Sequence, residues 1–379
     1  MGGITKVIIG IIVLVLVIWG ISALVTTSPK TAVSPTTSGE PIKIGFIGPL
    51  TGDAASLGTV ARAAVEVAAD EINKANGIGG RNLEVIYEDG QCSPKAASNA
   101  GNKLINVDKV TAIVGGLCSS ETATFAPVAM QSKTIVMSYC SSAPNLSSTG
   151  KYFFRDYPSD AYQGKFAAEY VYNTLGARNV ALLFHISDWG TGIKDVFKST
   201  FESLGGKIVA EEGTKSEARD YKTQLTKIKA AKPDYIYMPS YPEGATVAVK
   251  QARELGINTK MLGADAWSDL KFQKDVSGKG DILYIESATS MPDDFKAKIL
   301  AKTGGDQVPL CAPQAYDATK ILAQVMSKVG TDPDKIQDEL RAIQYSGVSG
   351  SIDFDENGDV TVAKYVVKRI ADGTATEVK

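Results

Sequence analysis

From residue 42 onward, short apolar runs alternate with longer segments in which apolar residues recur every three or four positions. The runs Ile42–Ile47, Leu83–Tyr87 and Thr111–Val114 have the length and composition of buried strands. Between them, the helical spacing of apolar residues in Val60–Asn73 and Lys95–Val107 predicts two helices. The alternation of strands and helices predicts a parallel sheet with right-handed crossover connections.

A second series of the same kind begins near Val180. Its expected strands are Val180–Phe184, Lys207–Ala210 and Tyr235–Met238, and its expected helices are Ile193–Leu204, Tyr221–Ala230 and Ala245–Leu255. The pattern therefore predicts an α/β protein with two successive, similar lobes, each built on a parallel central sheet.

The last part of the chain breaks the alternation. Two helical patterns, Ala312–Val329 and Asp334–Ile343, follow one another directly. After them, Ser351–Phe354 and Val360–Val367 are expected to pair as a hairpin, because Asn357-Gly358 between them is a favourable hairpin turn.

The same turn carries a cluster of acidic residues. The stretch Asp353-Phe-Asp-Glu-Asn-Gly-Asp359 resembles the start of a calcium-binding loop, but Lys364 occupies the twelfth position, where such loops need a bidentate Glu. No metal site is predicted.

Near the N-terminus, the apolar residues form one long continuous run. Val7–Val25 is apolar or small throughout and would span about 28 Å as a helix, close to the thickness of a bilayer core. The Ser/Thr/Pro-rich segment Thr26–Pro41 is typical of an extended stalk. We expect residues 1–41 to form an uncleaved transmembrane anchor and stalk; the alternative is a processed export signal. Both place the remainder at the cell surface, outside the cytoplasm.

Charge and histidine content exclude several classes of function. The formal net charge is −2, without a basic patch, so nucleic acid is not an expected partner. The only histidine, His185, ends an expected strand, where we interpret it as an ordinary polar residue. A nucleophilic enzyme based on Cys118 or a nearby serine would lack an adjacent base, so we expect no enzymatic activity.

Polar segments follow the expected strands of the first lobe, namely Pro49–Asp53, Val114–Thr122 (VGGLCSSET) and Ser138–Pro144. Ligands of open α/β sheets bind outside the carboxyl ends of the strands. In VGGLCSSET, two glycines would let the backbone approach a ligand, and Ser119 or Ser120 could cap the next helix. A helix start with free N–H groups suits a carboxylate, although simple capping would account for the serines equally well.

Taken together, the longer motifs resemble the periplasmic leucine/isoleucine/valine-binding proteins of ABC transporters. The resemblance extends from Ile42 to the C-terminus and is carried by IGFIGPLTGDAASLG, NGIGGRNLEVIYEDGQCSPKAAS, VGGLCSSETATFAPV, SYCSSAPNL, FRDYPSDAYQG, DWGTG, LGADAW and SIDFDENGDV. It implies a type I binding protein, in which ligand is trapped between two Rossmann-like lobes joined by three crossovers. Lobe 1 would comprise 42–157 and 289–346, and lobe 2 would comprise 158–288 and 347–379.

The resemblance also implies a function. The protein would be the extracytoplasmic substrate-binding component of an ABC importer, with monomeric lobes and no cofactor. It would bind an amino acid, branched-chain or otherwise apolar, and deliver it to permease subunits. Two alternatives remain: a different small ligand, such as an amide, urea or aromatic acid, or a surface sensor built on the same fold.

By the same resemblance, Ser119 and Ser142 would donate hydrogen bonds to the ligand carboxylate. The carbonyl of Cys140 would accept a hydrogen bond from the ligand ammonium, and Asp265, in the other lobe, would neutralise its charge. This mapping agrees with the chemistry, because a buried zwitterion needs donors at one end and an anion at the other.

The residues expected around the ligand side chain depart from the family pattern. Trp189 and Tyr241 fall at positions where the family has aromatic residues lining the cleft. Leu57 replaces an aromatic residue, Cys311 replaces a bulky one, and Asp265 is one methylene shorter than the usual Glu. These differences leave the preferred amino acid open.

Four cysteines in an exported chain can form two disulfides with three connectivities. The resemblance pairs Cys92 with Cys118, which would make Cys118 structural. Cys140 and Cys311 both map near the ligand, and the sequence leaves open whether they form a second disulfide.

Overall fold

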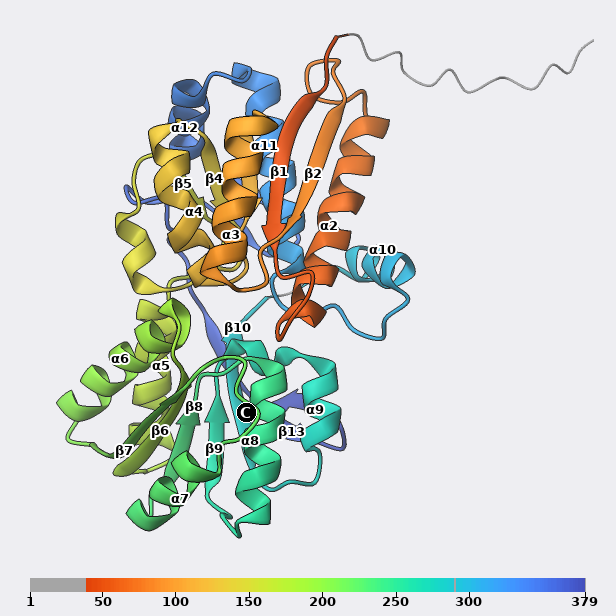
Figure 1. Ribbon diagram of the computed structural model, residues 1–379. Coiled ribbons are helices and arrows are strands. Elements are labelled where there is room, and N and C mark those ends of the chain that lie inside the picture. The colour runs from red at the N-terminus through yellow and green to blue at the C-terminus, as the bar shows by residue number, and fades with distance from the viewer. Residues whose placement is uncertain (1–38, 290, 379) are drawn as a thin grey trace, which may run out of the picture. The chain divides into compact units, whose positions relative to one another are not determined.

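The computed structural model describes residues 39–289 and 291–378, which contain two large β-sheets and a separate two-stranded sheet (Figure 1). The transmembrane helix expected at Val7–Val25 lies outside these residues. Within the described ranges, no helix has both the length and the apolar character needed to cross a membrane.

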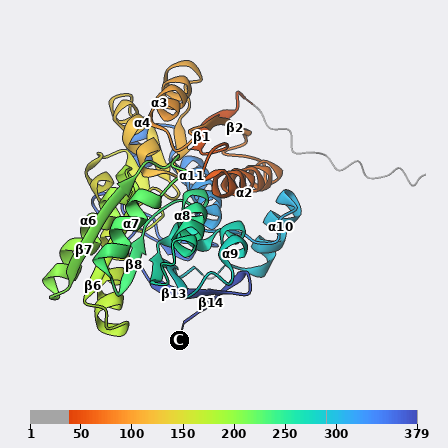
Figure 2. The same ribbon diagram turned by 60° about the horizontal axis from the view of Figure 1, so that its bottom comes forward.

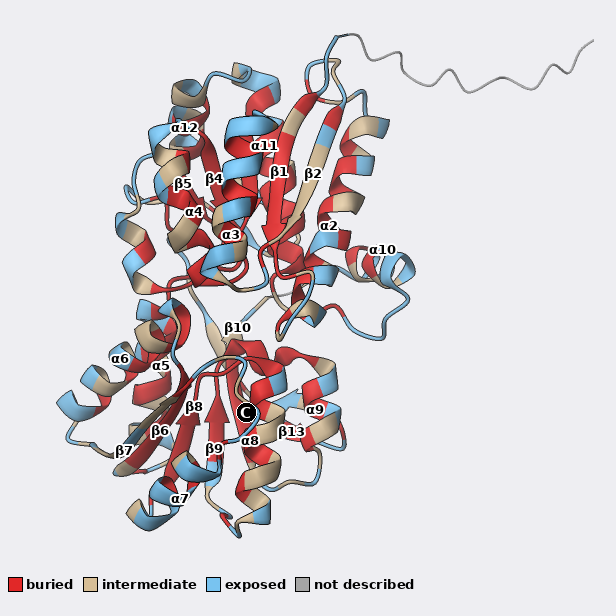
Figure 3. Ribbon diagram, viewed as in Figure 1, coloured by how far each residue is buried: buried red, intermediate tan, exposed pale blue. Residues whose placement is uncertain are grey.

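The first sheet has five parallel strands in the order β2-β1-β3-β4-β5. Its strands are β1 (Ile42–Gly48), β2 (Leu83–Asp89), β3 (Ala112–Gly115), β4 (Ile135–Ser138) and β5 (Phe153–Arg155). The helices around it are α2 (Ala55–Lys74), α3 (Pro94–Asn102), α4 (Ser119–Gln131), α11 (Ala312–Val329) and α12 (Pro333–Ala342). Strands β1, β3 and β4 are almost wholly buried, which explains their continuous apolar sequences. Figure 3 shows β1 and β4 mostly in the red of buried residues.

The second sheet has seven strands in the order β14-β13-β10-β9-β8-β6-β7. Strands β6 (Asn179–His185), β7 (Lys207–Thr214), β8 (Tyr235–Met238), β9 (Lys260–Gly263) and β10 (Ile282–Ser287) are parallel, whereas β13 (Tyr365–Ala371) and β14 (Thr374–Glu377) are antiparallel additions. Its helices are α5 (Asp160–Glu169), α6 (Asp188–Ser203), α7 (Lys222–Ala231), α8 (Pro242–Glu254) and α9 (Leu270–Val276). The turned view in Figure 2 shows β13 and β14 at the edge of this sheet, next to the C-terminus.

The two sheets share one topology. In order of appearance along the chain, the parallel strands of each sheet follow the spatial order 2-1-3-4-5. This confirms the expectation of two α/β lobes with parallel central sheets. In such a sheet the strand order reverses beside the first strand, between β1 and β3 and again between β6 and β8, and ligands bind at this switch point.

After β10, the chain leaves the second sheet and returns to the first. Helix α10 (Asp293–Thr303) and α11 pack on α2, whose buried face is formed by small and aliphatic residues at helical spacing. Glu71 of α2 accepts ion pairs from Lys298 at 2.9 Å and Lys320 at 3.3 Å. These contacts fix α10 and α11 beside α2, although more than 200 residues separate the paired side chains in sequence.

The predicted hairpin between Ser351–Phe354 and Val360–Val367 is confirmed only next to its turn. A turn at Asn357-Gly358 does form, but it closes only a short loop with a bridge between Phe354 and Val360. Strand β12 (Ser351–Ile352) pairs with β11 (Tyr345–Ser346), and β13 starts at Tyr365 and pairs with β10 and β14. The β-branched run around Val366 is compatible with any partner strand, so local turn chemistry did not determine its pairing.

The acidic residues of this loop have protein partners. Asp359 pairs with the fully buried Arg155, at 2.6 Å to Nε and 3.0 Å to Nη2. The Asp355 carboxylate accepts hydrogen bonds from the backbone N–H groups of Asn357 and Asp359. The loop that imitates a calcium site therefore uses its carboxylates to order itself and to anchor the end of β5.

Candidate ligand-binding site

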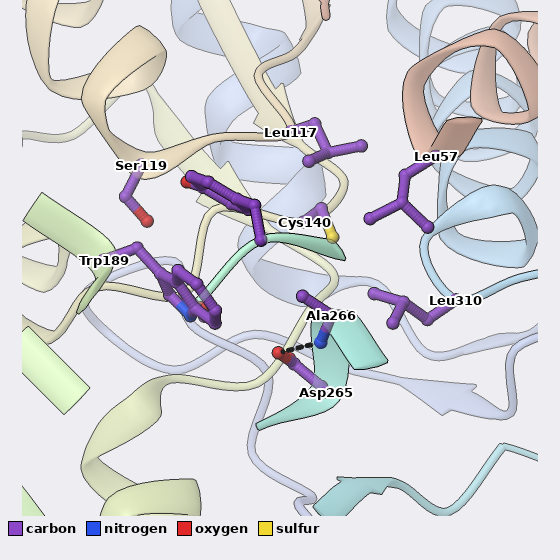
Figure 4. A pocket seen from close by; sticks show the side chains of 10 residues that line it. Leu57, Leu117, Ser119, Cys140, Trp189, Asp265, Ala266 and Leu310 are labelled. Carbon is purple, nitrogen blue, oxygen red and sulfur yellow. Dashed lines mark hydrogen bonds between the residues drawn. The ribbon is translucent and has the colours of Figure 1, made fainter. Parts of the chain in front are cut away.

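The loops at the two switch points face one cavity. From the first sheet come the loop after β1, the loop after β3 and the loop after β4; from the second come the loops after β6, β8 and β9. The cavity is lined by Leu57, Leu117, Ser119, Cys140, Ser142, Trp189, Tyr241, Asp265, Ala266 and Leu310 (Figure 4). The atom-free space between them, open solvent included, is about 310 Å³.

One wall carries hydroxyl groups. Ser119 is the first residue of α4, and its Oγ accepts a 3.1 Å hydrogen bond from the Ala143 N–H, so its own proton is free to be donated. The hydroxyl of Ser142 lies 2.7 Å from Asp160 Oδ2. The prediction that Ser119 or Ser120 caps α4 is wrong, because Cys118 is the N-cap residue.

The loop between β3 and α4 is held by a buried carboxylate. Glu121 accepts backbone hydrogen bonds from Cys92 at 3.0 Å, Leu117 at 3.1 Å and Cys118 at 3.0 Å. A Cβ at Gly116 would lie 2.9 Å from the Cβ of Glu121, so this position requires glycine for packing inside the loop. Gly116 does not line the cavity, which corrects the expectation that the glycines bring the backbone to a ligand.

The opposite wall carries the acidic group. Asp265 begins a short 3-10 helix, η4 (Asp265–Ser268), and is 4% exposed. Its Oδ2 accepts a 2.7 Å hydrogen bond from the Tyr157 hydroxyl, and its Oδ1 accepts one of 2.8 Å from the Ala266 N–H. Burial raises the pKa of Asp265, whereas these hydrogen bonds act to lower it. A cationic group in the cavity would complete this arrangement.

Aromatic side chains form a third wall. The rings of Trp189 and Tyr241 stack with their centroids 4.9 Å apart. Trp189 lies in the first turn of α6, and Tyr241 precedes α8 and donates its backbone N–H to His185 Nδ1 at 3.1 Å. Burial lowers the pKa of His185 to about 4, so this imidazole is neutral at physiological pH and acts as an acceptor.

The remaining wall is aliphatic and lies next to a disulfide. Leu57, Leu117 and Leu310 come from three different segments, and Leu310 precedes Cys311 (Figure 4). The structure links Cys311 to Cys140, with the Cα atoms 5.4 Å apart. Cys311 is fully buried, so Leu310 rather than Cys311 contributes the side chain at this wall.

A second disulfide links Cys92 to Cys118, with Cα atoms 5.2 Å apart. Glu121 lies beside it, but the two sulfurs are bonded to each other, and the carboxylate is occupied by the backbone N–H groups described above. This cluster is therefore a structural element of the loop, and Cys118 is not a free thiol.

The structure brings all seven residues expected at the ligand into this cavity, namely Leu57, Ser119, Cys140, Ser142, Trp189, Tyr241 and Asp265. Leu117, Ala266 and Leu310 also line the cavity, although they were not predicted from the sequence. Leu117 and Ala266 lie just after strands β3 and β9, so the position after a strand end was the available signal for them. Leu310 lies between α10 and α11, and its only signal was its neighbour Cys311. Tyr157 and Asp160, which support the site from behind, gave no local signal, because their contacts join segments that are distant in sequence.

Two sheets of the same topology hold a cavity with polar and apolar walls between their switch points. The family model described as periplasmic binding protein matches residues 41–375, and the chain belongs to this family. The family comprises solute-binding proteins, not enzymes.

Several relatives are similar over nearly the full length. The chain is 30% identical to the leucine-, isoleucine-, valine-, threonine- and alanine-binding protein of Pseudomonas aeruginosa, covering 89% of this chain and 92% of that protein. The crystal structure of the leucine-binding protein LivK from Thermotoga maritima is 26% identical, with a TM-score of 0.82, covering 89% of this chain and 98% of that one. LivJ from Streptococcus pneumoniae, a branched-chain amino acid transporter substrate-binding protein solved with isoleucine, is 27% identical, with a TM-score of 0.79, covering 89% and 100%.

Proposed function

We propose that this protein binds a free amino acid with an aliphatic side chain and is the substrate-binding component of an ABC importer. The observation that carries this proposal is the distribution of chemistry around one small cavity. Hydroxyl donors lie on one wall, a buried carboxylate on the opposite wall, and three leucines on the aliphatic wall. A zwitterion with an aliphatic side chain satisfies all three.

The roles follow from this arrangement. Ser119 and Ser142 donate to the ligand carboxylate, and the Cys140 carbonyl and Asp265 receive the ammonium. Trp189 and Tyr241 cover the ligand, and Leu57, Leu117 and Leu310 contact its side chain. The names of the relatives support the class of ligand, since they refer to leucine, isoleucine, valine, threonine and alanine. Three leucines without a polar partner on the side-chain wall favour leucine, isoleucine and valine over threonine.

We propose further that binding closes two lobes. Lobe 1 comprises 42–157 and 289–346, lobe 2 comprises 158–288 and 347–379, and the three connections between them act as the hinge. The ligand stabilises the closed state because it contacts residues of both lobes at once. The closed form is the one that would deliver the amino acid to the permease.

The apolar run Val7–Val25 supports membrane attachment at the cell surface. The stalk 26–41 would keep the lobes near a permease and raise their effective concentration there. Fractionation of the native cells tests this: the protein should sediment with membranes and be released by detergent. Recovery of a soluble form that lacks the first 41 residues would overturn the anchor.

Binding itself is tested by calorimetry on the full-length protein with amino acids, amides and aromatic acids. We expect one saturable site for leucine, isoleucine or valine, and no binding of the corresponding amides, because an amide lacks the anionic end. Preferential binding of an aromatic acid or an amide would reject the amino-acid assignment, and binding of none of them would favour another role for this fold.

A further inference from the structure

A second buried carboxyl, Asp160, lies directly behind the wall of hydroxyls. It is the first residue of α5 and is fully buried. Its Oδ2 lies 2.7 Å from Ser142 Oγ, and its backbone N–H donates to the Ser142 carbonyl, also at 2.7 Å. Among residues 39–289 and 291–378, no group donates a hydrogen bond to Asp160 Oδ1. Asp160 is thus tied to Ser142 at two points and has one oxygen without a donor.

The two buried carboxyls near the cavity differ in their donors. Asp265 receives a donor on each oxygen, from Tyr157 and from Ala266. Asp160 has Ser142 alone. A buried carboxylate is stable only when its oxygens are satisfied, and two neighbouring buried anions repel each other. The arrangement therefore favours the negative charge on Asp265 and a neutral acid at Asp160.

The surrounding charges agree with this assignment. Burial, followed by the charge on Asp265, raises the pKa of Asp160 well above its usual range. Arg155 acts in the opposite direction, but its guanidinium is occupied by Asp359, Ser147 and two backbone carbonyls. The other titratable groups near the two carboxyls are the buried phenols of Tyr157, Tyr237, Tyr241 and Tyr365, all of which are neutral, and the carboxylate of Glu286. The charge on Glu286 acts to raise the pKa of Asp265, but the two donors on Asp265 act in the opposite direction. The positive end of α5 favours an anion, but this effect is smaller than the cost of burying one with a single donor.

We propose that Asp160 is held as a neutral carboxylic acid that donates its proton to Ser142 Oγ, which frees the Ser142 proton for the ligand carboxylate. A hydroxyl has only one proton. If Asp160 were ionised, it would take that proton, and Ser142 would present only lone pairs to an incoming carboxylate. Asp160 is then a positioning residue that sets the direction of a chain of hydrogen bonds from Asp160 through Ser142 to the ligand.

This inference rests on the proposed function and explains how a site with two buried carboxyls can accept a ligand that carries one ammonium and one carboxylate. Asp265 supplies the single negative charge that matches the ammonium. Asp160 supplies a donor without a second charge, which would otherwise repel the ligand carboxylate.

The test uses Asp160→Asn, because an amide keeps a donor for Ser142 and mimics the neutral acid. Calorimetry with leucine should give a dissociation constant within about threefold of the parent. Asp160→Leu, which has neither donor nor charge, and Ser142→Ala should each weaken binding about tenfold. Asp265→Asn should weaken it by more than about a hundredfold. If Asp160→Asn weakened binding as strongly as Asp265→Asn, Asp160 would be acting as an anion and the proposal would be wrong.

Infrared difference spectroscopy gives an independent measure of the protonation state. At neutral pH, the parent minus Asp160→Asn spectrum should contain the carbonyl stretch of a protonated carboxylic acid. A carboxylate band in its place would overturn the proposal, even if the variant cannot be assayed for binding. The spectrum needs no ligand. Failure of the parent to bind any amino acid would therefore refute the proposed function without deciding the state of Asp160.

Discussion

Tyr157 Oη donates a 2.7 Å hydrogen bond to Asp265 Oδ2, and this contact joins the segment after β5 to the segment after β9. Both groups are buried. Burial raises the pKa of Tyr157, so the phenol stays protonated and remains a donor. The Asp265 carboxylate, which we assign to the ligand ammonium, is thus oriented by Tyr157, which follows the last strand of the first sheet.

The first prediction concerns this pair. Asp265→Asn keeps the shape of the side chain but removes the countercharge, and should reduce the binding free energy of leucine by about 3–5 kcal/mol. Tyr157→Phe removes one hydrogen bond to the carboxylate and should cost about 1–3 kcal/mol, because the acceptor is charged. Calorimetry measures both values.

The control for these variants is Asp269→Asn. Asp269 is also buried, but its Oδ1 accepts from the Phe272 N–H at the start of α9, and Asn preserves this cap. Binding by Asp269→Asn should equal that of the parent. Unchanged binding by Asp265→Asn would show that the ammonium lies elsewhere.

Much of the fold was predictable because its strands are buried on both faces and therefore read as continuous apolar runs. Strand β9, Lys260–Gly263, was not predicted because only Met261 and Leu262 in it are large and apolar, whereas the equally short β8 is apolar throughout. The tail was mispredicted because a favourable Asn-Gly turn is local, whereas the pairing of β13 with β10 depends on where the chain crosses between sheets.

In the candidate site, too, features with a local sequence signal were predictable and those that depend on tertiary contacts were not. Ser119 and Asp265 lie at strand ends within motifs that resemble a known family, so their place at the cavity could be anticipated. The hydrogen bonds between Ser142 and Asp160 and between Tyr157 and Asp265 could not, because they join residues 18 and 108 positions apart. Such contacts depend on tertiary packing and leave no periodic signal in the sequence.

The second prediction concerns an ion pair that joins the loop after β1 to the loop after β7. Arg219 contacts Asp53 through two nitrogens and lies 3.1 Å from Glu243. The Arg219 side chain is 47% exposed, so the pair should stabilise the closed form by at most about 1 kcal/mol. Arg219→Met should increase the dissociation rate of leucine by up to about fivefold at low salt, measured by stopped flow, and high salt should remove the difference.

Arg62→Met is the matched control, since Arg62 pairs with Glu66 inside helix α2 at 2.9 Å. It should leave ligand dissociation unchanged. Equal dissociation rates for Arg219→Met and the parent at low salt would exclude a role for this pair in closure.

The third prediction separates the two disulfides. Cys92→Ser/Cys118→Ser removes a short-loop constraint, so it should lower the free energy of unfolding by roughly 3 kcal/mol without changing the ratio of leucine to alanine affinity. Cys140→Ser/Cys311→Ser should change this ratio, because Cys311 has φ 70° and directly follows Leu310 at the aliphatic wall. Denaturant unfolding and calorimetry provide the two measurements. An unchanged ratio in the second variant would show that Leu310 is held without the disulfide.

The fourth prediction is a pH dependence caused by His185. Its pKa falls from an ordinary value of 6.5 to about 4 on folding, chiefly through burial. Below pH 6.5 the unfolded chain binds a proton at His185 that the folded protein does not bind. The contribution of neutral His185 to the free energy of unfolding is therefore complete above pH 6.5 and is lost as the pH falls towards about 4. The total loss is about 3 kcal/mol.

His185→Asn removes the titration while keeping an acceptor for the Tyr241 N–H. The stability difference between parent and variant should therefore be largest near neutral pH and should shrink by up to about 3 kcal/mol as the pH is lowered towards 4. Urea unfolding at a series of pH values measures it. A difference that does not depend on pH would mean that His185 is equally protonated in the folded and unfolded states.

The last prediction uses the two tryptophans of the described chain, which report on different places. Trp189 lines the cavity and stacks on Tyr241, whereas Trp267 is fully buried and donates its Nε1–H to the Ser240 carbonyl at 3.2 Å. An amino acid that enters the cavity changes the surroundings of Trp189 and leaves those of Trp267 almost unaltered. We expect leucine to change the intrinsic fluorescence saturably, with one site. Trp189→Phe should remove most of this signal while binding persists by calorimetry, and Trp267→Phe should retain it. If the signal survived in Trp189→Phe but disappeared in Trp267→Phe, closure would be reaching the core of the second sheet rather than the cavity wall.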